Sequence, residues 1–122
     1  VEVIKRRMAY DQDWAAFTAT YRSGQKELGQ AILRARRLLP QVGVSDALLS
    51  MVAKLAIQLG VDGHRADITL IKWAITLAAL AGREQAGPED IRQAARLALP
   101  HRMRRRPFEE GTLDWTAVEA AL

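Results

Sequence analysis

The sequence predicts an all-α fold, a small bundle of four to five helices. Apolar residues recur at the i, i+3, i+4 spacing of a helix in one segment after another. Glycine, proline and capping residues stand between these segments, where helices begin and end. The chain has 122 residues, of which 49% are hydrophobic. A single domain of this size buries about two-thirds of its unfolded surface around one core.

The first third of the chain is expected to form three helices. Residues 1–10 place three apolar side chains on one helical face, namely Val1, Ile4 and Met8. Asp13 can cap a second helix that continues through Arg22 and carries an aromatic row of Trp14, Phe17 and Tyr21. Such a row is more typical of a core than of a ligand site, and Gly24 is expected to break the helix that carries it. A third helix over 25–39 ends before Pro40, with a predicted inward face of Leu28, Ile32, Ala35 and Leu39.

The middle of the chain predicts two apolar helices. Ser45 is the expected N-cap of a helix that runs to Leu59, with an inner stripe of Leu48, Leu49, Val52, Leu55 and Leu59. The second helix covers 63–81, with Asp62 as its N-cap and Gly82 after its end. Two adjacent apolar rows predict that it is packed against on most sides. The rows are Ile68, Ile71, Ile75 and Ala78, and Leu70, Ala74, Leu77 and Ala81.

The last third begins with a helix that Pro88 opens at its first position, followed by two acids in the first turn. Its shallow apolar face comprises Ile91, Ala94, Ala95 and Ala98. Gly87 offers no capping side chain, so we expect a slightly weaker start. Pro100 interrupts this helix, and from Gly111 onward a last short helix is expected to dock through Trp115 and Val118.

Composition excludes several classes of function. The chain has no cysteine, which excludes disulfides and thiolate metal sites. Its two histidines lack the spacing of zinc ligands, so no metal site is expected. No apolar run reaches the length of about 18 residues that a membrane span needs, and VEVIKRRMAY lacks a signal-peptide pattern. We therefore expect a soluble cytoplasmic protein without a membrane partner.

Motifs for nucleotide hydrolysis are absent from these 122 residues. There is no GxxxxGK[ST] phosphate loop, and no apolar strand ends in paired acids that could hold Mg²⁺. No catalytic residue is therefore expected in this chain. Because VEVIKRRMAY reads as the middle of a helix, the sequence predicts a fragment of a longer protein.

Arg65 stands in the opening turn of the apolar helix over 63–81. A cation is mildly disfavoured at the positive end of a helix, whereas that end suits an anion. The arginine therefore indicates either a phosphate partner or a surface salt bridge with Asp62 or Asp67, worth about 0–1 kcal/mol. Spacing alone favours the salt bridge.

Four segments, in order, resemble the C-terminal lid of the magnesium chelatase I-subunit family of AAA+ ATPases: VDGHRAD, AALAGR, PEDIRQAARLAL and HRMRRRPFE. The resemblance is close over 60–110 and looser over 1–59. It implies that Arg65 is the sensor-2 residue that contacts the γ-phosphate of ATP, with His64 as a further candidate contact. It also implies a division into the end of the AAA+ core or a connecting helix (1–10), the helical lid (11–110) and a C-terminal tail or short helix (111–122).

The same resemblance implies the working assembly. Such subunits form hexameric rings and hydrolyse ATP with Mg²⁺, which the AAA+ core of the same chain mainly binds. With a second AAA+ subunit and a porphyrin-binding subunit, they insert Mg²⁺ into protoporphyrin IX. The resemblance favours a contact with neighbouring ring subunits for four basic residues, Arg102, Arg104, Arg105 and Arg106. A solvated basic tail and a nucleic-acid backbone contact are the other interpretations of this segment.

Two other functions are compatible with parts of the sequence. MoxR-type AAA+ chaperone ATPases have a similar lid with an arginine in the same turn, but VDGHRAD and HRMRRRPF favour the chelatase group. The other is a basic helical nucleic-acid-binding module, since residues 48–81 read as helix, turn, helix. A recognition helix needs polar and basic residues toward the groove, whereas this one shows Asp67 followed by apolar residues, which disfavours nucleic acid as a partner.

Overall fold

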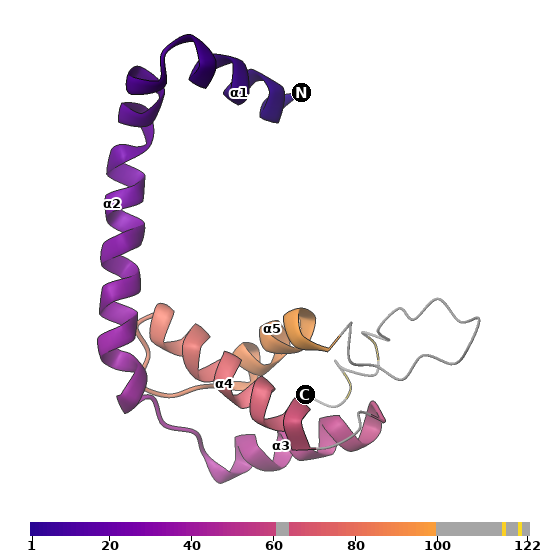
Figure 1. The fold of residues 1–122 in the computed structure, drawn as a ribbon. Helices are drawn as coiled ribbons and strands as arrows, with labels where there is room; N and C mark the ends of the chain where they lie inside the picture. The colour runs from indigo at the N-terminus through magenta and orange to yellow at the C-terminus, as the bar shows by residue number, and fades with distance from the viewer. Residues whose placement is uncertain (61–63, 100–115, 117–119, 121–122) are drawn as a thin grey trace, which may run out of the picture. The chain divides into compact units, whose positions relative to one another are not determined.

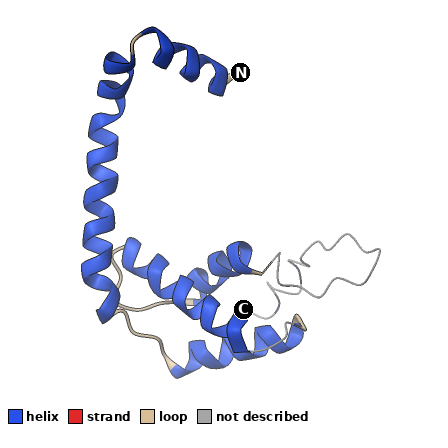
Figure 2. Cartoon of the chain, in the orientation of Figure 1, coloured by secondary structure: helices blue, strands red, loops and turns tan. Residues whose placement is uncertain are grey.

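The computed structural model describes residues 1–60, 64–99, 116 and 120, and Figure 1 shows the arrangement of their helices. The elements are α1 (Glu2–Gln12), α2 (Trp14–Leu38), the 3-10 helix η1 (Leu39–Gln41), α3 (Asp46–Gln58), α4 (His64–Leu80) and α5 (Pro88–Ala98). Figure 2 shows helices and loops but no strand in the described part of the chain. The prediction of an all-α fold with four to five helices is confirmed.

The chain divides into two compact units, Val1–Leu33 and Arg34–Leu122. The first contains α1 and most of α2. The second contains the end of α2, η1 and the helices α3 to α5.

The helix α2 is longer than expected, because it continues through Gly24 and Gly29 without a break. The prediction that Gly24 ends a helix is wrong. A glycine in an exposed helix interior lowers the stability of the helix by only about 1 kcal/mol relative to alanine. The helical turns on either side of Gly24 outweigh this loss. The expected cap at Asp13 is present, since its Oδ1 accepts from the backbone N–H of Ala16 at 3.0 Å.

The first unit has no buried core, since no residue of α1 or α2 is buried. The expected core role of the aromatic row is therefore wrong: Trp14 is 66% and Tyr21 40% exposed, and only Phe17 is half-buried. The predicted inward face of residues 25–39 is also exposed at Leu28 and Ile32. Two helices alone enclose few side chains, because each covers only one side of the other.

The core of the chain lies in the second unit, where α4 packs against both α3 and α5 (Figure 1). Each helix contributes a fully buried side chain: Leu55 from α3, Leu70 from α4 and Ile91 from α5. The predicted face of α5 is confirmed, since all four of its members are buried, namely Ile91, Ala94, Ala95 and Ala98. Half-buried Ala35 and Leu38, at the end of α2, pack against the same core.

The expectation that α4 is packed on most sides is wrong. Ile68 is 54% and Trp73 41% exposed, and on α3 the predicted inner residue Leu49 is 45% exposed. Among the described helices only α3 and α5 pack extensively on α4, so one side of it stays open. The sequence pattern overestimated how much of the helix is covered.

The helix ends follow the predicted capping chemistry. The hydroxyl of Ser45 accepts from the backbone N–H of Leu48 at 3.2 Å, which confirms it as the N-cap of α3. After α4, Gly82 has φ +76°, and two backbone bonds close the end: Gly82 N–H to Ala79 at 3.0 Å and Arg83 N–H to Ala78 at 2.9 Å. This is the Schellman arrangement that glycine favours. The predicted cap Asp62 lies outside the described residues.

Two loops are joined beside the core. The backbone N–H of Gly43 donates to the carbonyl of Glu84 at 2.8 Å, and that of Ala86 donates to the carbonyl of Gly43 at 3.0 Å. These bonds tie the segment before α3 to the connection between α4 and α5. A Cβ atom at Gly43 would lie 2.7 Å from Nε2 of Gln85, so a larger residue there would require the end of the Gln85 side chain to move.

Candidate functional site

The first turn of α4 carries the two predicted contact residues for a nucleotide. Arg65 is exposed, and its carbonyl accepts from the hydroxyl of Thr69 at 2.7 Å. The alternative salt bridge to Asp67 is not formed, and no ion pair joins Arg65 to any residue that the structure describes. The other proposed partner, Asp62, lies outside those residues. The guanidinium is therefore available to a ligand.

Asp67 follows Arg65 by two positions in the first turn of α4. Its Oδ2 is 3.4 Å from Nδ1 of His64, whose side chain is 98% exposed, while its Oδ1 is buried and accepts no hydrogen bond. His64 and Arg65 thus present two nitrogen-bearing side chains at the positive end of α4, where an anion is favoured. A guanidinium makes charge-assisted, bidentate hydrogen bonds to phosphate oxygens. The charge and hydrogen-bonding chemistry of this turn therefore suit a phosphate group.

The four arginines of the basic segment, Arg102, Arg104, Arg105 and Arg106, lie outside the described residues, so their predicted contact with a neighbouring subunit stays a prediction. Within the part that the structure describes, no group of three or more His, Asp or Glu side chains could hold a metal ion. No helix among the described residues is long and apolar enough to cross a membrane.

A buried ion pair fixes the start of α5. The guanidinium of Arg83 donates to both carboxylate oxygens of Asp90, at 2.8 and 2.5 Å, and Oδ2 also accepts from the backbone N–H of Gly87 at 2.8 Å. Hydrogen bonding to Arg83 lowers the pKa of Asp90 from its ordinary value. Burial opposes this shift and the Gly87 N–H adds to it. The carboxylate therefore supplies the cap that Gly87 lacks.

Sequence reasoning treated Asp90 only as a first-turn acid and missed its pairing with Arg83. The two residues are seven positions apart in the sequence, which is too far for a pair on one helix. The available signal is the Gly87–Pro88 turn between them, which brings the chain back toward Arg83. The pair has a structural role. The Asp90 side chain is buried at 4% exposure, whereas the Arg83 side chain is 47% exposed.

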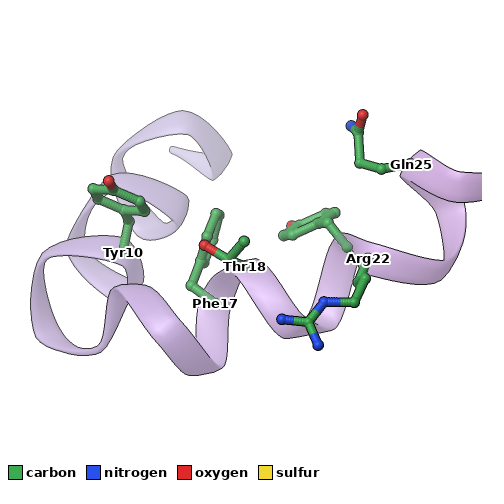
Figure 3. Close-up of a pocket in the computed structure, with 6 residues that line it drawn as sticks. Tyr10, Phe17, Thr18, Arg22 and Gln25 are labelled. Atoms are coloured by element: carbon green, nitrogen blue, oxygen red, sulfur yellow. The ribbon is translucent and has the colours of Figure 1, made fainter. Parts of the chain in front are cut away.

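An aromatic hollow of about 410 Å³ lies in the first unit, between α1 and α2 (Figure 3). It is lined by Tyr10, Phe17, Thr18, Tyr21, Arg22 and Gln25. The ring of Phe17 packs against those of Tyr10 and Tyr21, with centroids 5.7 and 4.9 Å apart. The rings stabilise one another, and no buried polar group is directed at the hollow. It therefore has the character of a partly formed packing surface rather than of a specific ligand site.

The chain is similar to subunits of magnesium chelatase from several organisms. A magnesium-chelatase subunit ChlI homolog of Methanocaldococcus jannaschii is 43% identical over 119 residues, which are 98% of this chain and 33% of that protein. A magnesium-chelatase 38 kDa subunit of Acidiphilium rubrum is 39% identical over 122 residues, 100% of this chain and 35% of that protein. An uncharacterized protein of Mycobacterium tuberculosis is 42% identical over 122 residues, which are 19% of its length.

The chain thus spans about a third of the length of these relatives, or less. The family described as the AAA lid domain matches residues 49–121, more than half of the chain. This match contains α4 with Arg65, the packed helix α5 and most of α3. The chain therefore belongs to the AAA lid domain family.

Proposed function

We propose that this chain is the lid of the ATPase subunit of a magnesium-chelatase-type complex. The observation that carries the proposal is the similarity to proteins named magnesium-chelatase subunits, which extends over 98–100% of the chain. The exposed arginine at the start of α4 supports it, because a lid that senses nucleotide needs a free cation there. The names of these relatives favour a chelatase over a MoxR-type chaperone.

In this role Arg65 is the sensor-2 residue and contacts the γ-phosphate of ATP, with His64 as a further contact. The contact exists only while the γ-phosphate is present, so hydrolysis releases the arginine and lets the lid move. Because α4 packs against both α3 and α5, a displacement of its first turn is passed to the rest of the helical core. The lid thereby reports the state of the nucleotide.

The nucleotide itself, ATP with Mg²⁺, is bound mainly by the AAA+ core in the remaining part of the longer protein. Residues 1–10 form the end of that core or the helix that connects to it, 11–110 the lid, and 111–122 a tail or short helix. Burial supports a partner for the first segment: α1 has no buried residue, and Val3 and Ile4 are 80% and 64% exposed. An apolar surface of this kind favours coverage by another part of the protein.

The partners follow from the same proposal. The lid contacts neighbouring subunits of a hexameric ring through its basic segment, Arg102, Arg104, Arg105 and Arg106. The ring acts with a second AAA+ subunit and a porphyrin-binding subunit, and ATP hydrolysis is coupled to insertion of Mg²⁺ into protoporphyrin IX. The lid does not touch the porphyrin.

The test is the substitution Arg65→Ala in the full-length ATPase subunit. Loss of one preorganised contact to the reacting phosphate lowers ATP turnover on the order of 10²-fold, while helical circular dichroism stays unchanged. Arg36→Ala is the matched control, since Arg36 is an exposed arginine in the last turn of α2, and its turnover should equal that of the unmodified subunit. Unchanged turnover in Arg65→Ala would reject the sensor role.

A further inference from the structure

One face of α2 carries a row of residues at alternating steps of three and four. This is the spacing of the seam of a coiled coil, where each residue of the row packs against a second helix. The row, named the α2 seam, consists of Trp14, Phe17, Tyr21, Gly24, Leu28 and Ala31. None of these residues is buried, and Trp14 and Leu28 are 66% and 53% exposed. The α2 seam therefore has the pattern of a helix-packing surface without the helix that would cover it.

The sizes of the side chains along the α2 seam indicate the direction of the missing helix. The three aromatic rings lie in its first half, whereas Gly24 and Ala31 lie in its second half. Two parallel copies of α2 would place Trp14 against Trp14 and Gly24 against Gly24, which overfills one layer and leaves a void in another. In an antiparallel pair centred on residues 22–23, each aromatic ring instead faces a smaller side chain of the second copy. The layers are then Trp14 with Ala31, Phe17 with Leu28, and Tyr21 with Gly24.

The side chains that border the α2 seam favour the same antiparallel pair. Asp13 and Arg34 border its two ends on one edge, so Asp13 of each copy meets Arg34 of the other. Both side chains are exposed, and neither forms an ion pair with a residue that the structure describes. On the other edge, the hydroxyl of Thr18 meets the amide of Gln25. In a parallel pair Asp13 would lie beside Thr18, and the two ion pairs between the copies would be lost.

The aromatic hollow of the first unit lies on the α2 seam (Figure 3). Its lining includes the seam residues Phe17 and Tyr21 together with Thr18 and Gln25 from one edge. In the antiparallel pair, Leu28 of the second copy lies over Phe17 and enters this hollow. An open hollow lined by aromatic rings is thus the expected state of a single copy, and a second copy closes it.

We propose that α2 is a self-association surface, on which two copies of this chain pair antiparallel through the α2 seam. The contact is isologous, because both copies use the same residues around a two-fold axis. Contacts between neighbours in a ring are head-to-tail, so this pairing is separate from ring assembly and does not depend on the proposed function. The α2 seam is only about 27 Å long. The dimer is therefore weak, and its population rises with protein concentration.

Sedimentation equilibrium of the 122-residue chain measures this pairing. We expect dimers to form with a Kd between about 10 µM and 1 mM. Gly24→Glu places an unpaired charge in the α2 seam and should abolish the dimer. Gly29→Glu is the matched control, because it makes the same substitution on the outward face of the same helix, and its dimer should persist. A Cβ atom at either glycine meets nothing within 4 Å in a single copy, so only a second copy distinguishes the two variants.

The ion pairs are tested by Arg34→Glu, which sets two carboxylates against each other at each end of the α2 seam. Its Kd should rise severalfold relative to that of Arg36→Glu, which makes the same charge change on the outward face of α2. Equal dissociation constants for these two variants would refute the predicted contact between Asp13 and Arg34.

The direction of pairing is tested by cross-linking, since the chain has no cysteine. A mixture of Thr18→Cys and Gln25→Cys, treated with a short bis-maleimide, should give more cross-linked dimer than either variant alone. Efficient cross-linking of Leu28→Cys to itself would show a parallel pair and overturn the proposal. A chain that stays monomeric at 1 mM, or equal association of Gly24→Glu and Gly29→Glu, would also overturn it. The same mixture is then prepared in the full-length subunit, where absence of the cross-link would mean that the rest of the longer protein covers the α2 seam instead of a second copy.

Discussion

The pair between Arg83 and Asp90 gives the sharpest prediction about stability. Asp90→Ala removes a carboxylate that is 4% exposed and leaves the backbone N–H of Gly87 without its acceptor. Hydrogen bonds to a charged group contribute about 1.5–3 kcal/mol. The hydrogen bonds from Arg83 contribute at the low end of this range. The Arg83 side chain is 47% exposed, so its guanidinium can bond to water when the carboxylate is removed. We therefore expect a loss of about 2–3 kcal/mol in the free energy of unfolding.

The assay is urea denaturation followed by circular dichroism at 222 nm. With a slope of about 2 kcal/mol per molar urea, the midpoint falls by about 1 M. Asp90→Asn keeps an acceptor for Gly87 but loses the charge, so its midpoint should fall by about half as much. Glu89→Ala is the matched control: it removes the neighbouring acid, which pairs with Arg92 at the surface and is 66% exposed. Equal midpoints for Asp90→Ala and Glu89→Ala would refute the reasoning.

Three further predictions concern the pH dependence of stability, two glycine substitutions and the assembly of the subunit ring. The pKa of Asp90 is lower in the folded chain than its unfolded value of about 3.9, so the pair stabilises fully above that pH and its contribution is lost as the pH falls through the folded pKa. Unfolding free energies measured from neutral to acidic pH should therefore decline less steeply at the acid end in Asp90→Asn, and identical curves would contradict this. Gly82→Ala should destabilise the lid by about 1–2 kcal/mol, because alanine is strained at φ +76°. Gly24→Ala should instead stabilise α2 by up to about 1 kcal/mol. If both substitutions shifted the urea and thermal midpoints in the same direction, this contrast would be disproved. Replacing Arg104, Arg105 and Arg106 with alanine in the full-length subunit should weaken ring assembly, and hexamers that persist at low micromolar protein would count against the subunit contact.

Local chemistry was predictable from the sequence where one helix turn decides the outcome. The cap at Ser45 and the stop at Gly82 each depend on a hydroxyl or a positive φ within a few residues, and both are confirmed. The buried face of α5 was also predictable, because alanines at helical spacing around Ile91 suit a close contact with another helix. Arg65 was placed correctly in the first turn of α4, because the apolar periodicity marks the helix that follows it.

Features that depend on distant parts of the chain were not predictable. Whether Gly24 breaks a helix depends on the turns beside it, and a single residue carries too small a free energy to decide it. Whether Trp14 or Ile68 is buried depends on which element covers it. Periodicity identifies the apolar face of a helix but does not reveal which element packs against that face. The pairing of Arg83 with Asp90 needs the reversal of the chain at Gly87, which spacing along one helix does not reveal.

The two backbone bonds at Gly43 have a consequence for the order of folding. They connect the segment before α3 to the one before α5, so they close a ring of chain that contains α3 and α4 entire. Closing a ring of this size costs entropy before any contact repays it. The helices inside the ring and their mutual packing should therefore form first, and this closure should come late. The amide of Gly43 is then a reporter on the last step in the folding of the second unit.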